Sequence, residues 1–212
     1  MSAVELVCFD LDGTLVDSER LCNQAFLELL PQLDDTVEGM VSRYRGVKFA
    51  PIAADLARRI GQPLADDFET RYRARVAQLF DEELVPMPGV LDMISHLHLP
   101  FCLVSNGPLP KMRHALAVTG LAPWFGDRLF SAYDVGVWKP DPGLFLHVAA
   151  HYGAAPRHCV VVEDSPTGVA GAVAAGMQAL YYQPHGLVDS VPDGARAFHQ
   201  MNELPGLLVA LE

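Results

Sequence analysis

The chain has 212 residues, of which 50% are hydrophobic and 19% are charged, and its formal net charge is −11 at pH 7. These values are typical of a soluble globular protein with one main core and room for a small second domain, and they exclude disordered and fibrous classes. The negative charge disfavours a nucleic-acid partner held through phosphate contacts. The N-terminus lacks the basic start of a signal peptide, and no apolar run reaches the roughly 18 residues of a membrane span, so we expect a cytoplasmic protein with no membrane partner.

The first predicted element is a short, nearly continuous apolar strand at residues 5–9, the pattern of a strand buried on both faces of a parallel sheet. Asp10 and Asp12 follow it, and in an extended chain this spacing puts both carboxylates on one face. Two such charges about 4 Å apart repel by roughly 4 kcal/mol near a protein surface, so the pair needs a cation or a shared proton. Mg²⁺ suits such oxygen ligands. Taken alone, the DLDGT stretch is equally compatible with a polar turn.

A helical period and a higher charge density follow, over residues 17–85. Four helices are predicted here, at residues 22–30, 37–44, 52–60 and 68–84, with Asp66 as the cap of the longest. Breaks fall at Pro31, Gly46 and Gly61. The sequence therefore predicts an all-helical domain at 17–85, inserted into an α/β domain made of residues 1–16 and 86–212.

From residue 90 onward, helices and strands alternate. The predicted helices are 90–97, 111–119, 142–152 and 167–176, and the predicted strands are 101–104, 128–131, 159–162 and 178–182. Ser165 and Pro166 suit the start of the last helix. This alternation predicts a doubly wound α/β fold with a parallel sheet, whose ligands bind outside the carboxyl ends of the strands.

The four cysteines show no spacing that is typical of a disulfide framework or a zinc site. Three of them, Cys8, Cys102 and Cys159, lie within apolar runs, and Cys22 lies in a predicted helix. Buried free thiols are expected.

Polar residues follow three of the apolar strands at their carboxyl ends: Asp10, then Ser105, then Glu163 with Asp164. Lys139 comes from the loop after another predicted strand. Each piece alone is an ordinary turn or helix start. Because parallel strands end at one edge of a sheet, we expect these side chains to meet in one crevice. Carboxylates, a hydroxyl and an ammonium at one point fit Mg²⁺-assisted phosphoryl transfer.

With these residues in place, the chain resembles the haloacid-dehalogenase superfamily of phosphatases over its full length. The matching motifs are DLDGT at 10–14, VSN at 104–106, Lys139 in WKPDP, and VEDS at 162–165. The resemblance implies that Asp10 is a nucleophile that forms an aspartyl-phosphate. It also implies that Asp12 protonates the leaving oxygen and then activates water, roles that carboxyl groups can perform.

The same resemblance implies the metal and phosphate ligands. Asp10, the backbone carbonyl of Asp12, and Asp164 would hold Mg²⁺, with Glu163 acting through water. Ser105 and the backbone of Asn106 would donate to the phosphoryl oxygens, and Lys139 would offset the charge that develops in transfer. A dehalogenase is disfavoured, because that branch lacks the second aspartate of the pair.

Substrate contacts are expected mainly from basic residues. The chain has twelve arginines and three lysines, Lys48, Lys111 and Lys139, each beside a predicted loop or helix start, and a compact ammonium can approach phosphate closely. The helical insertion is similar to the superfamily's cap, and its basic loop 43–48 supplies Arg45 and Lys48, although such a loop is also compatible with a solvated charge cluster. Thr14 and Lys111 are further candidates for substrate binding.

Segments 43–48, 72–84, 104–112 and 129–142 resemble the branch of this superfamily that hydrolyses 6-phosphogluconate. The predicted function is therefore a Mg²⁺-dependent phosphatase of small phosphorylated metabolites, with 6-phosphogluconate favoured. Two alternatives stay open: a sugar phosphomutase of β-phosphoglucomutase type, and a non-catalytic protein that binds phosphorylated metabolites. The sequence leaves the oligomeric state undetermined.

Overall fold

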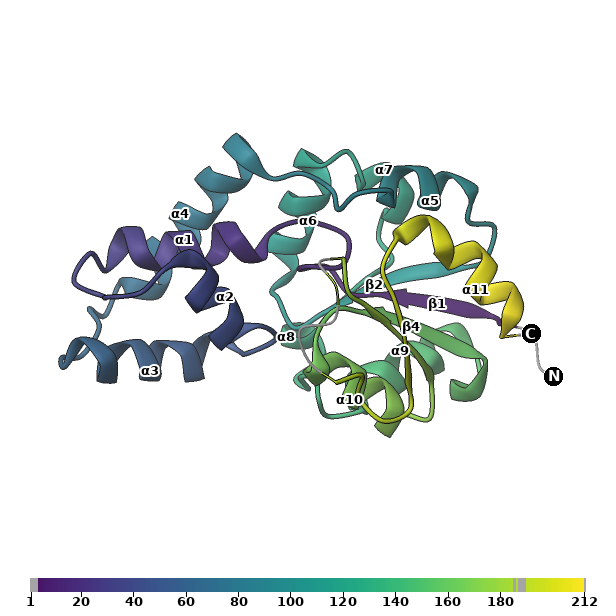
Figure 1. Ribbon diagram of the computed structural model, residues 1–212. Helices are drawn as coiled ribbons and strands as arrows, with labels where there is room; N and C mark the ends of the chain where they lie inside the picture. The colour runs from purple at the N-terminus through teal and green to yellow at the C-terminus, as the bar shows by residue number, and fades with distance from the viewer. Residues whose placement is uncertain (1–3, 185, 187–189, 212) are drawn as a thin grey trace.

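The computed structural model describes residues 4–184, 186 and 190–211. Within them, six strands form one parallel sheet (Figure 1). Their order across the sheet is β3 (Leu129–Ser131), β2 (Phe101–Ser105), β1 (Leu6–Phe9), β4 (Cys159–Glu163), β5 (Gln178–Tyr182) and β6 (Ala195–Phe198). The chain order reverses on either side of β1, so β1, β2 and β4 end side by side. The predicted doubly wound α/β class is confirmed.

Alternate residues of each strand face two different layers of helices. Leu6 and Cys8 of β1 join the apolar cluster under α9 (Gly143–Tyr152) and α10 (Pro166–Ala174). Val7 and Phe9 face the other cluster, which is covered by α5 (Val90–His96), α6 (Leu109–Val118), α7 (Ala122–Phe125) and α11 (Leu204–Ala210). Burial on both faces explains why these strands read as continuous apolar runs. The cysteines are free thiols, as predicted, and three of them are buried.

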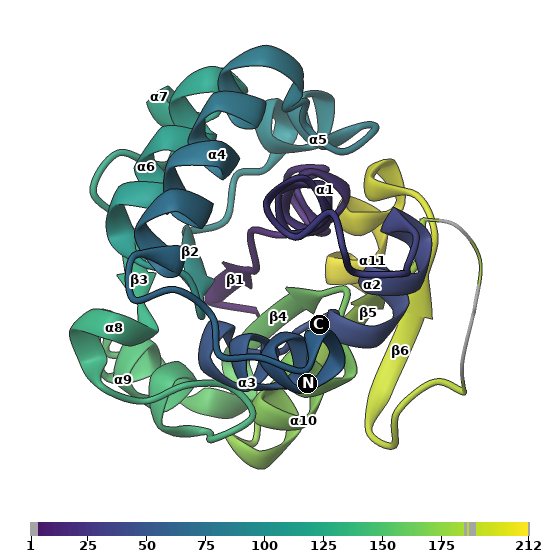
Figure 2. The ribbon, with the colours of Figure 1, turned by 90° about the vertical axis from the view of Figure 1, so that its left-hand side faces the viewer.

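Helices α1 (Glu19–Leu29), α2 (Val37–Tyr44), α3 (Phe49–Ile60) and α4 (Phe68–Glu83) lie together beyond the carboxyl end of the sheet. Figure 2 looks onto this end, with these helices in front of the sheet. They enclose an apolar cluster of their own, in which the Phe26 ring stacks on Tyr72 at a centroid distance of 4.0 Å. The inner parts of α1 and α4 instead join the cluster over the sheet, through residues such as Ala25 and Leu79.

The two chain segments that join the helices to the sheet run side by side. The Asp17 backbone N–H donates to the Val85 carbonyl at 3.0 Å, and Met87 N–H donates to the Leu15 carbonyl at 2.9 Å. Val16 and Pro86 form an isolated antiparallel bridge between them. This double crossing lies at the predicted boundaries of the insertion, and the division into two domains remains a prediction.

Several sequence predictions needed correction. Helix α4 has Asp67 rather than Asp66 as its N-terminal cap residue, and that side chain makes no capping bond. The short helices α7 and α8 (Ala132–Val135), the edge strand β6 and the last helix α11 were not predicted. Ser165 does begin α10, because its hydroxyl accepts from Gly168 N–H at 3.1 Å. Within the described residues, no helix is both long and apolar enough to cross a membrane.

Candidate active site

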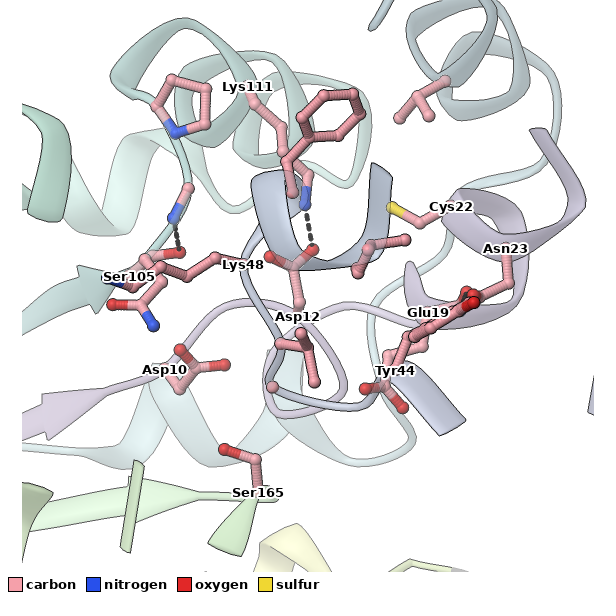
Figure 3. Close-up of a pocket in the computed structure, with 18 of the residues that line it drawn as sticks. Asp10, Asp12, Glu19, Cys22, Asn23, Tyr44, Lys48, Ser105, Lys111 and Ser165 are labelled. Atoms are coloured by element: carbon pink, nitrogen blue, oxygen red, sulfur yellow. Dashed lines mark hydrogen bonds and ion pairs between the residues drawn. The ribbon is translucent and has the colours of Figure 1, made fainter. Parts of the chain in front are cut away.

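A cavity of about 620 Å³ lies between the carboxyl edge of the sheet and helices α1–α4 (Figure 3). The sheet contributes polar lining residues: Asp10, Asp12, Ser105, Asn106, Lys139, Glu163 and Asp164. The helices contribute a mainly apolar wall: Cys22, Phe26, Phe49, Ile52, Tyr72, Val76 and Phe80. The structure therefore brings together the strand-end residues that the sequence singled out.

Lys139 connects two of the carboxylates. Its Nζ donates to Asp10 Oδ1 at 2.6 Å and to Glu163 Oε1 at 2.7 Å, and its side chain is buried. Burial alone would lower the pKa of Lys139, but these two carboxylates raise it well above the usual range. Burial raises the pKa of Asp10 to about 8, and the charge of Glu163 adds to this while Lys139 opposes it.

Glu163 is held at both of its oxygens. Oε1 accepts from Lys139, while Oε2 accepts from the Ser165 backbone N–H at 2.9 Å and from the Ser165 hydroxyl at 2.8 Å. A Cβ at Gly168 would overlap the Glu163 carboxyl group. The first turn of α10 can therefore lie against this carboxylate only because residue 168 is glycine.

Asp164 is the third buried carboxylate of the group. Its Oδ1 accepts from the Thr14 hydroxyl at 3.2 Å, and its Oδ2 lies 4.0 Å from Arg45 Nε. Gly13 has a φ of +78°, and a Cβ at this position would overlap the Asp164 carboxyl group. Burial raises the pKa of Asp164 well above its ordinary value. Thr14 thus contacts a carboxylate of the protein, and its assignment to substrate binding stays a prediction.

The carboxylates have the properties of a site for a divalent cation. One oxygen each of Asp10, Glu163 and Asp164 can be chosen within 4.8 Å of one another. In the contact network around them, five carboxyl groups (Asp10, Asp12, Glu19, Glu163, Asp164) face three cations (Lys111, Lys139, Arg45), a formal excess of two negative charges when all five are ionised. An all-oxygen donor set with uncompensated negative charge fits a hard divalent ion.

Asp12 is bound through one oxygen. A dashed line in Figure 3 joins Lys111 to Asp12; Lys111 Nζ donates to Asp12 Oδ1 at 2.7 Å, and the Ser18 hydroxyl donates to the same oxygen. Burial works to raise the pKa of Asp12, but the charge and hydrogen bond of Lys111, the Ser18 hydrogen bond and the charge of Lys139 together lower it. Within the described residues, Asp12 Oδ2 accepts no hydrogen bond. Lys111, expected at the substrate, therefore contacts the second aspartate in this structure.

Asn106 fixes the loop that carries Lys139. Its side-chain Oδ1 accepts from Lys139 N–H at 2.9 Å, and its Nδ2 donates to the Lys139 carbonyl at 3.2 Å. The neighbouring Ser105 hydroxyl accepts from Gly107 N–H at 3.0 Å. The assignment of Ser105 and the Asn106 backbone to the phosphoryl oxygens stays a prediction, while the side-chain role of Asn106 was not foreseen.

The basic loop between α2 and α3 reaches the same cavity. Arg45 Nε donates to Glu19 Oε2 at 3.1 Å, and Lys48 Nζ lies 4.6 Å from the centre of the Trp138 ring. Burial raises the pKa of Glu19 to about 7, and Arg45 opposes this rise. Sequence reasoning missed Ser18 and Glu19, although they follow the DLDGT motif within five residues. It also missed Trp138, although this residue directly precedes Lys139 in the sequence and could have been singled out for that reason.

Comparison with known proteins gives consistent matches. Residues 4–176 match the model of the haloacid dehalogenase-like hydrolases. The chain is 38% identical to 6-phosphogluconate phosphatase of Escherichia coli K12, over 98% of this chain and 96% of that protein. A haloacid dehalogenase-like protein from Agrobacterium tumefaciens is 30% identical, with a TM-score of 0.82 and 99% of each chain covered. A β-phosphoglucomutase-like structure from Thermotoga maritima is 26% identical, with a TM-score of 0.79, covering 98% of this chain and all of that one.

Proposed function

This chain belongs to the haloacid dehalogenase-like hydrolase family and is a phosphoric monoester hydrolase, and we propose that it hydrolyses phosphorylated sugars and sugar acids through a phosphorylated Asp10. One observation carries the proposal: the Lys139 ammonium lies between Asp10 and Glu163, at 2.6 and 2.7 Å, beside Asp164. This offers a carboxylate nucleophile, a cation for the transferred group and an acidic set for a divalent ion at one point.

In the first half of the reaction, an oxygen of Asp10 attacks phosphorus and the ester P–O bond breaks. Asp12 in its protonated form, which the contact with Lys111 disfavours before substrate binds, gives its proton to the leaving oxygen, so the sugar departs as a neutral alcohol. The Lys139 ammonium, the Ser105 hydroxyl and the Asn106 backbone N–H bind the phosphoryl oxygens, where negative charge is concentrated.

In the second half, the Asp12 carboxylate takes a proton from a water molecule, which attacks the phosphorus of the acyl phosphate. The bond to Asp10 breaks, inorganic phosphate leaves and the Asp10 carboxylate is restored. The contact of Lys111 with Asp12 favours the carboxylate form that this step requires.

The metal in this proposal is Mg²⁺, held by the side chains of Asp10 and Asp164 and by the backbone carbonyl of Asp12. When bound, it supplies positive charge that keeps Asp10 ionised and offsets charge on the phosphoryl group. Both oxygens of Glu163 already accept hydrogen bonds from protein groups, which supports a role through water rather than direct ligation.

The substrate proposal names 6-phosphogluconate as the favoured compound. It is supported by the relative of that activity at 38% identity and by the cation Lys48, which lines the cavity. A phosphate-release screen over phosphorylated sugars, sugar acids, nucleotides and phosphoenolpyruvate, with and without Mg²⁺, tests it. The highest kcat/KM is expected for 6-phosphogluconate, with Mg²⁺ required. A clear preference for nucleotides or phosphoenolpyruvate would contradict the substrate class.

Residues 17–85 are proposed to act as a helical cap that closes over the site and selects the leaving group. The paired segments at 15–17 and 85–87 are the expected hinge, because they are the two chain crossings between helices and sheet. Closure would exclude water from the pocket.

A phosphomutase remains the second candidate, because the β-phosphoglucomutase-like structure shares the fold. The two activities are separated by their products. Incubation with β-glucose 1-phosphate should yield free phosphate and glucose, whereas glucose 6-phosphate as the main product would identify a mutase.

A further inference from the structure

Two aromatic side chains near Lys139 contact cations of the helical segment. Trp138 and Tyr133, which we call the aromatic ledge, pack edge to face at a centroid distance of 5.6 Å. Lys48 Nζ lies 4.6 Å from the centre of the Trp138 ring. Arg73 donates to the Tyr133 hydroxyl at 3.2 Å, and its guanidinium carbon lies 5.8 Å from the centre of that ring. The ledge thus contacts one cation from the α2–α3 loop and one from α4.

Lys48 is positioned by an aromatic ring and not by a carboxylate. Within the described residues, Lys48 has no carboxylate partner, whereas Lys111, Lys139 and Arg45 each have at least one. A ring attracts an ammonium through its quadrupole and adds no net negative charge. Lys48 therefore keeps its full capacity to bind an anion while its position is restricted.

The backbone of Lys48 is also held near the catalytic residues. Gly46 has a φ of +70°, and a Cβ built on it would lie 3.0 Å from the Cβ of Ser165 and 3.3 Å from the Thr167 hydroxyl. The loop therefore contacts the start of α10, next to Asp164. Lys48 lines the cavity, while Trp138 is not among its lining residues, so the ring contacts Lys48 from outside the cavity.

We propose that Trp138 is a positioning residue that holds Lys48 at the cavity rim to bind an anionic group on the leaving group of the substrate. The substrate class is a phosphomonoester with a second anion, either a carboxylate or a second phosphate. The inference rests on the proposed phosphatase function. It deepens that function by assigning a role in selectivity to Trp138, which is not a lining residue of the cavity.

The first test compares Trp138→Leu with Trp138→Phe, which keeps an aromatic face. Loss of the ring should raise KM for 6-phosphogluconate about 2- to 30-fold, the range that corresponds to one cation–π contact, and kcat should change less. Trp138→Phe should restore most of the affinity. Glucose 6-phosphate, which lacks the carboxylate, should show a smaller change in KM. Comparing the change in KM for fructose 1,6-bisphosphate with that for 6-phosphogluconate shows whether a second phosphate or a carboxylate is the preferred anion.

The second test measures binding without turnover, in the Asp10→Asn background. 6-Phosphogluconate binding is followed by the fluorescence of Trp138, with Trp124→Phe introduced as a matched background because Trp124 lies in α7 and is not a lining residue. For affinities, isothermal titration of Lys48→Met, Trp138→Leu and the double variant gives a mutant cycle. The proposal expects a ligand-dependent fluorescence change that Lys48→Met removes, and non-additive losses in the cycle.

These tests distinguish failure of the positioning role of Trp138 from failure of the proposed phosphatase function. If wild type hydrolyses 6-phosphogluconate but Trp138→Leu raises KM equally for glucose 6-phosphate, or the losses are additive, the positioning role is overturned while the phosphatase function stands. If wild type neither binds nor hydrolyses any of the three sugar phosphates, the proposed function and this inference both fail.

Discussion

The two walls of the cavity are built differently. On the sheet side, Lys139 and Glu163 are 3% and 2% exposed, and each is bound by several partners. On the helical side, Lys48 is exposed and is held by a single ring, while Arg45 is partly exposed. Buried, mutually bound charges cannot move without leaving a partner unpaired, so the sheet side fixes the chemistry. The rim can adjust to a leaving group. We therefore expect variants on the sheet side to lower kcat and variants at the rim to raise KM.

The largest effect is expected from Asp10→Asn. The amide has nearly the same shape but is not a nucleophile, so kcat should fall by about 10⁴-fold or more while the fold is kept. Phosphate release and a circular dichroism spectrum check the two halves of this prediction. Mass spectrometry must first exclude deamidation back to Asp. Full activity of the intact variant would refute the assignment of Asp10 as the nucleophile.

Gly168→Ala tests whether the sheet side is as rigid as its contacts indicate. The new methyl group would displace the Glu163 carboxyl and disturb its contact with Lys139. We expect kcat to fall by about 10²-fold, the size seen when one electrostatic group is lost, and stability to fall by about 1–3 kcal/mol. Gly206→Ala in α11 is the matched control, because a Cβ there meets no atom within 4 Å. Equal behaviour of the two variants would mean that this wall is adaptable.

Lys111→Met tests the contact that holds Asp12. Without the ammonium, only Ser18 binds Oδ1, and the carboxyl group can turn away from the leaving oxygen. The expected loss in kcat is about 10-fold for sugar phosphates, which need protonation of the leaving group, and smaller for p-nitrophenyl phosphate. An identical loss for both substrates would argue that Lys111 does not act through Asp12.

Lys48→Ala tests the rim. KM for 6-phosphogluconate should rise about 3- to 10-fold, because a partly solvated charge pair is lost, while KM for p-nitrophenyl phosphate should change less. Arg58→Ala on α3 is the control, since that side chain is 76% exposed and, among the residues that the structure describes, its ion-pair partner is Asp55 alone. If Lys48→Ala raised both KM values equally, the rim would not select the leaving group.

The smallest effect concerns pH. Asp10 has a folded pKa of about 8 against an ordinary value of 3.8, so between these values the native state binds more protons than the unfolded state. The stability of the metal-free protein should therefore fall as pH rises from about 4 to 8, and Asp10→Asn should reduce this slope. Melting temperatures in EDTA at pH 5 and pH 8 measure it. A stability difference between variant and wild type that is independent of pH would contradict the raised pKa of the buried Asp10 carboxyl group.

The sheet side was largely predictable from the sequence. Asp10, Ser105 and Asp164 each follow an apolar run, and parallel topology requires such ends to meet. Strand β6 was not predictable in this way, because it is a short edge strand containing Arg196 and only Phe198 is buried. Helix α11 has only seven residues, and Pro205 and Gly206 lie within it.

The helical side was less predictable. Its helices follow from periodicity, but the contact of Lys48 with Trp138 joins residues 90 positions apart, as the contact of Lys111 with Asp12 on the sheet side joins residues 99 apart. Local patterns carry no information about such distances, so the sequence indicated basic residues without indicating their partners. Glu19 was missed for the same reason, since its contact with Arg45 depends on how α1 packs beside α2.

The central claim is that Asp10 carries the phosphoryl group between two half reactions. Asp12→Asn should slow hydrolysis of the acyl phosphate, so the variant can be mixed with p-nitrophenyl phosphate, which needs little acid assistance, quenched in acid and digested for mass spectrometry. We predict one phosphoryl group on the peptide that contains Asp10, labile to hydroxylamine and absent when Asp10 is also changed to Asn. A phosphoryl group on any other residue, or burst release of p-nitrophenol with no phosphorylated peptide, would contradict the account.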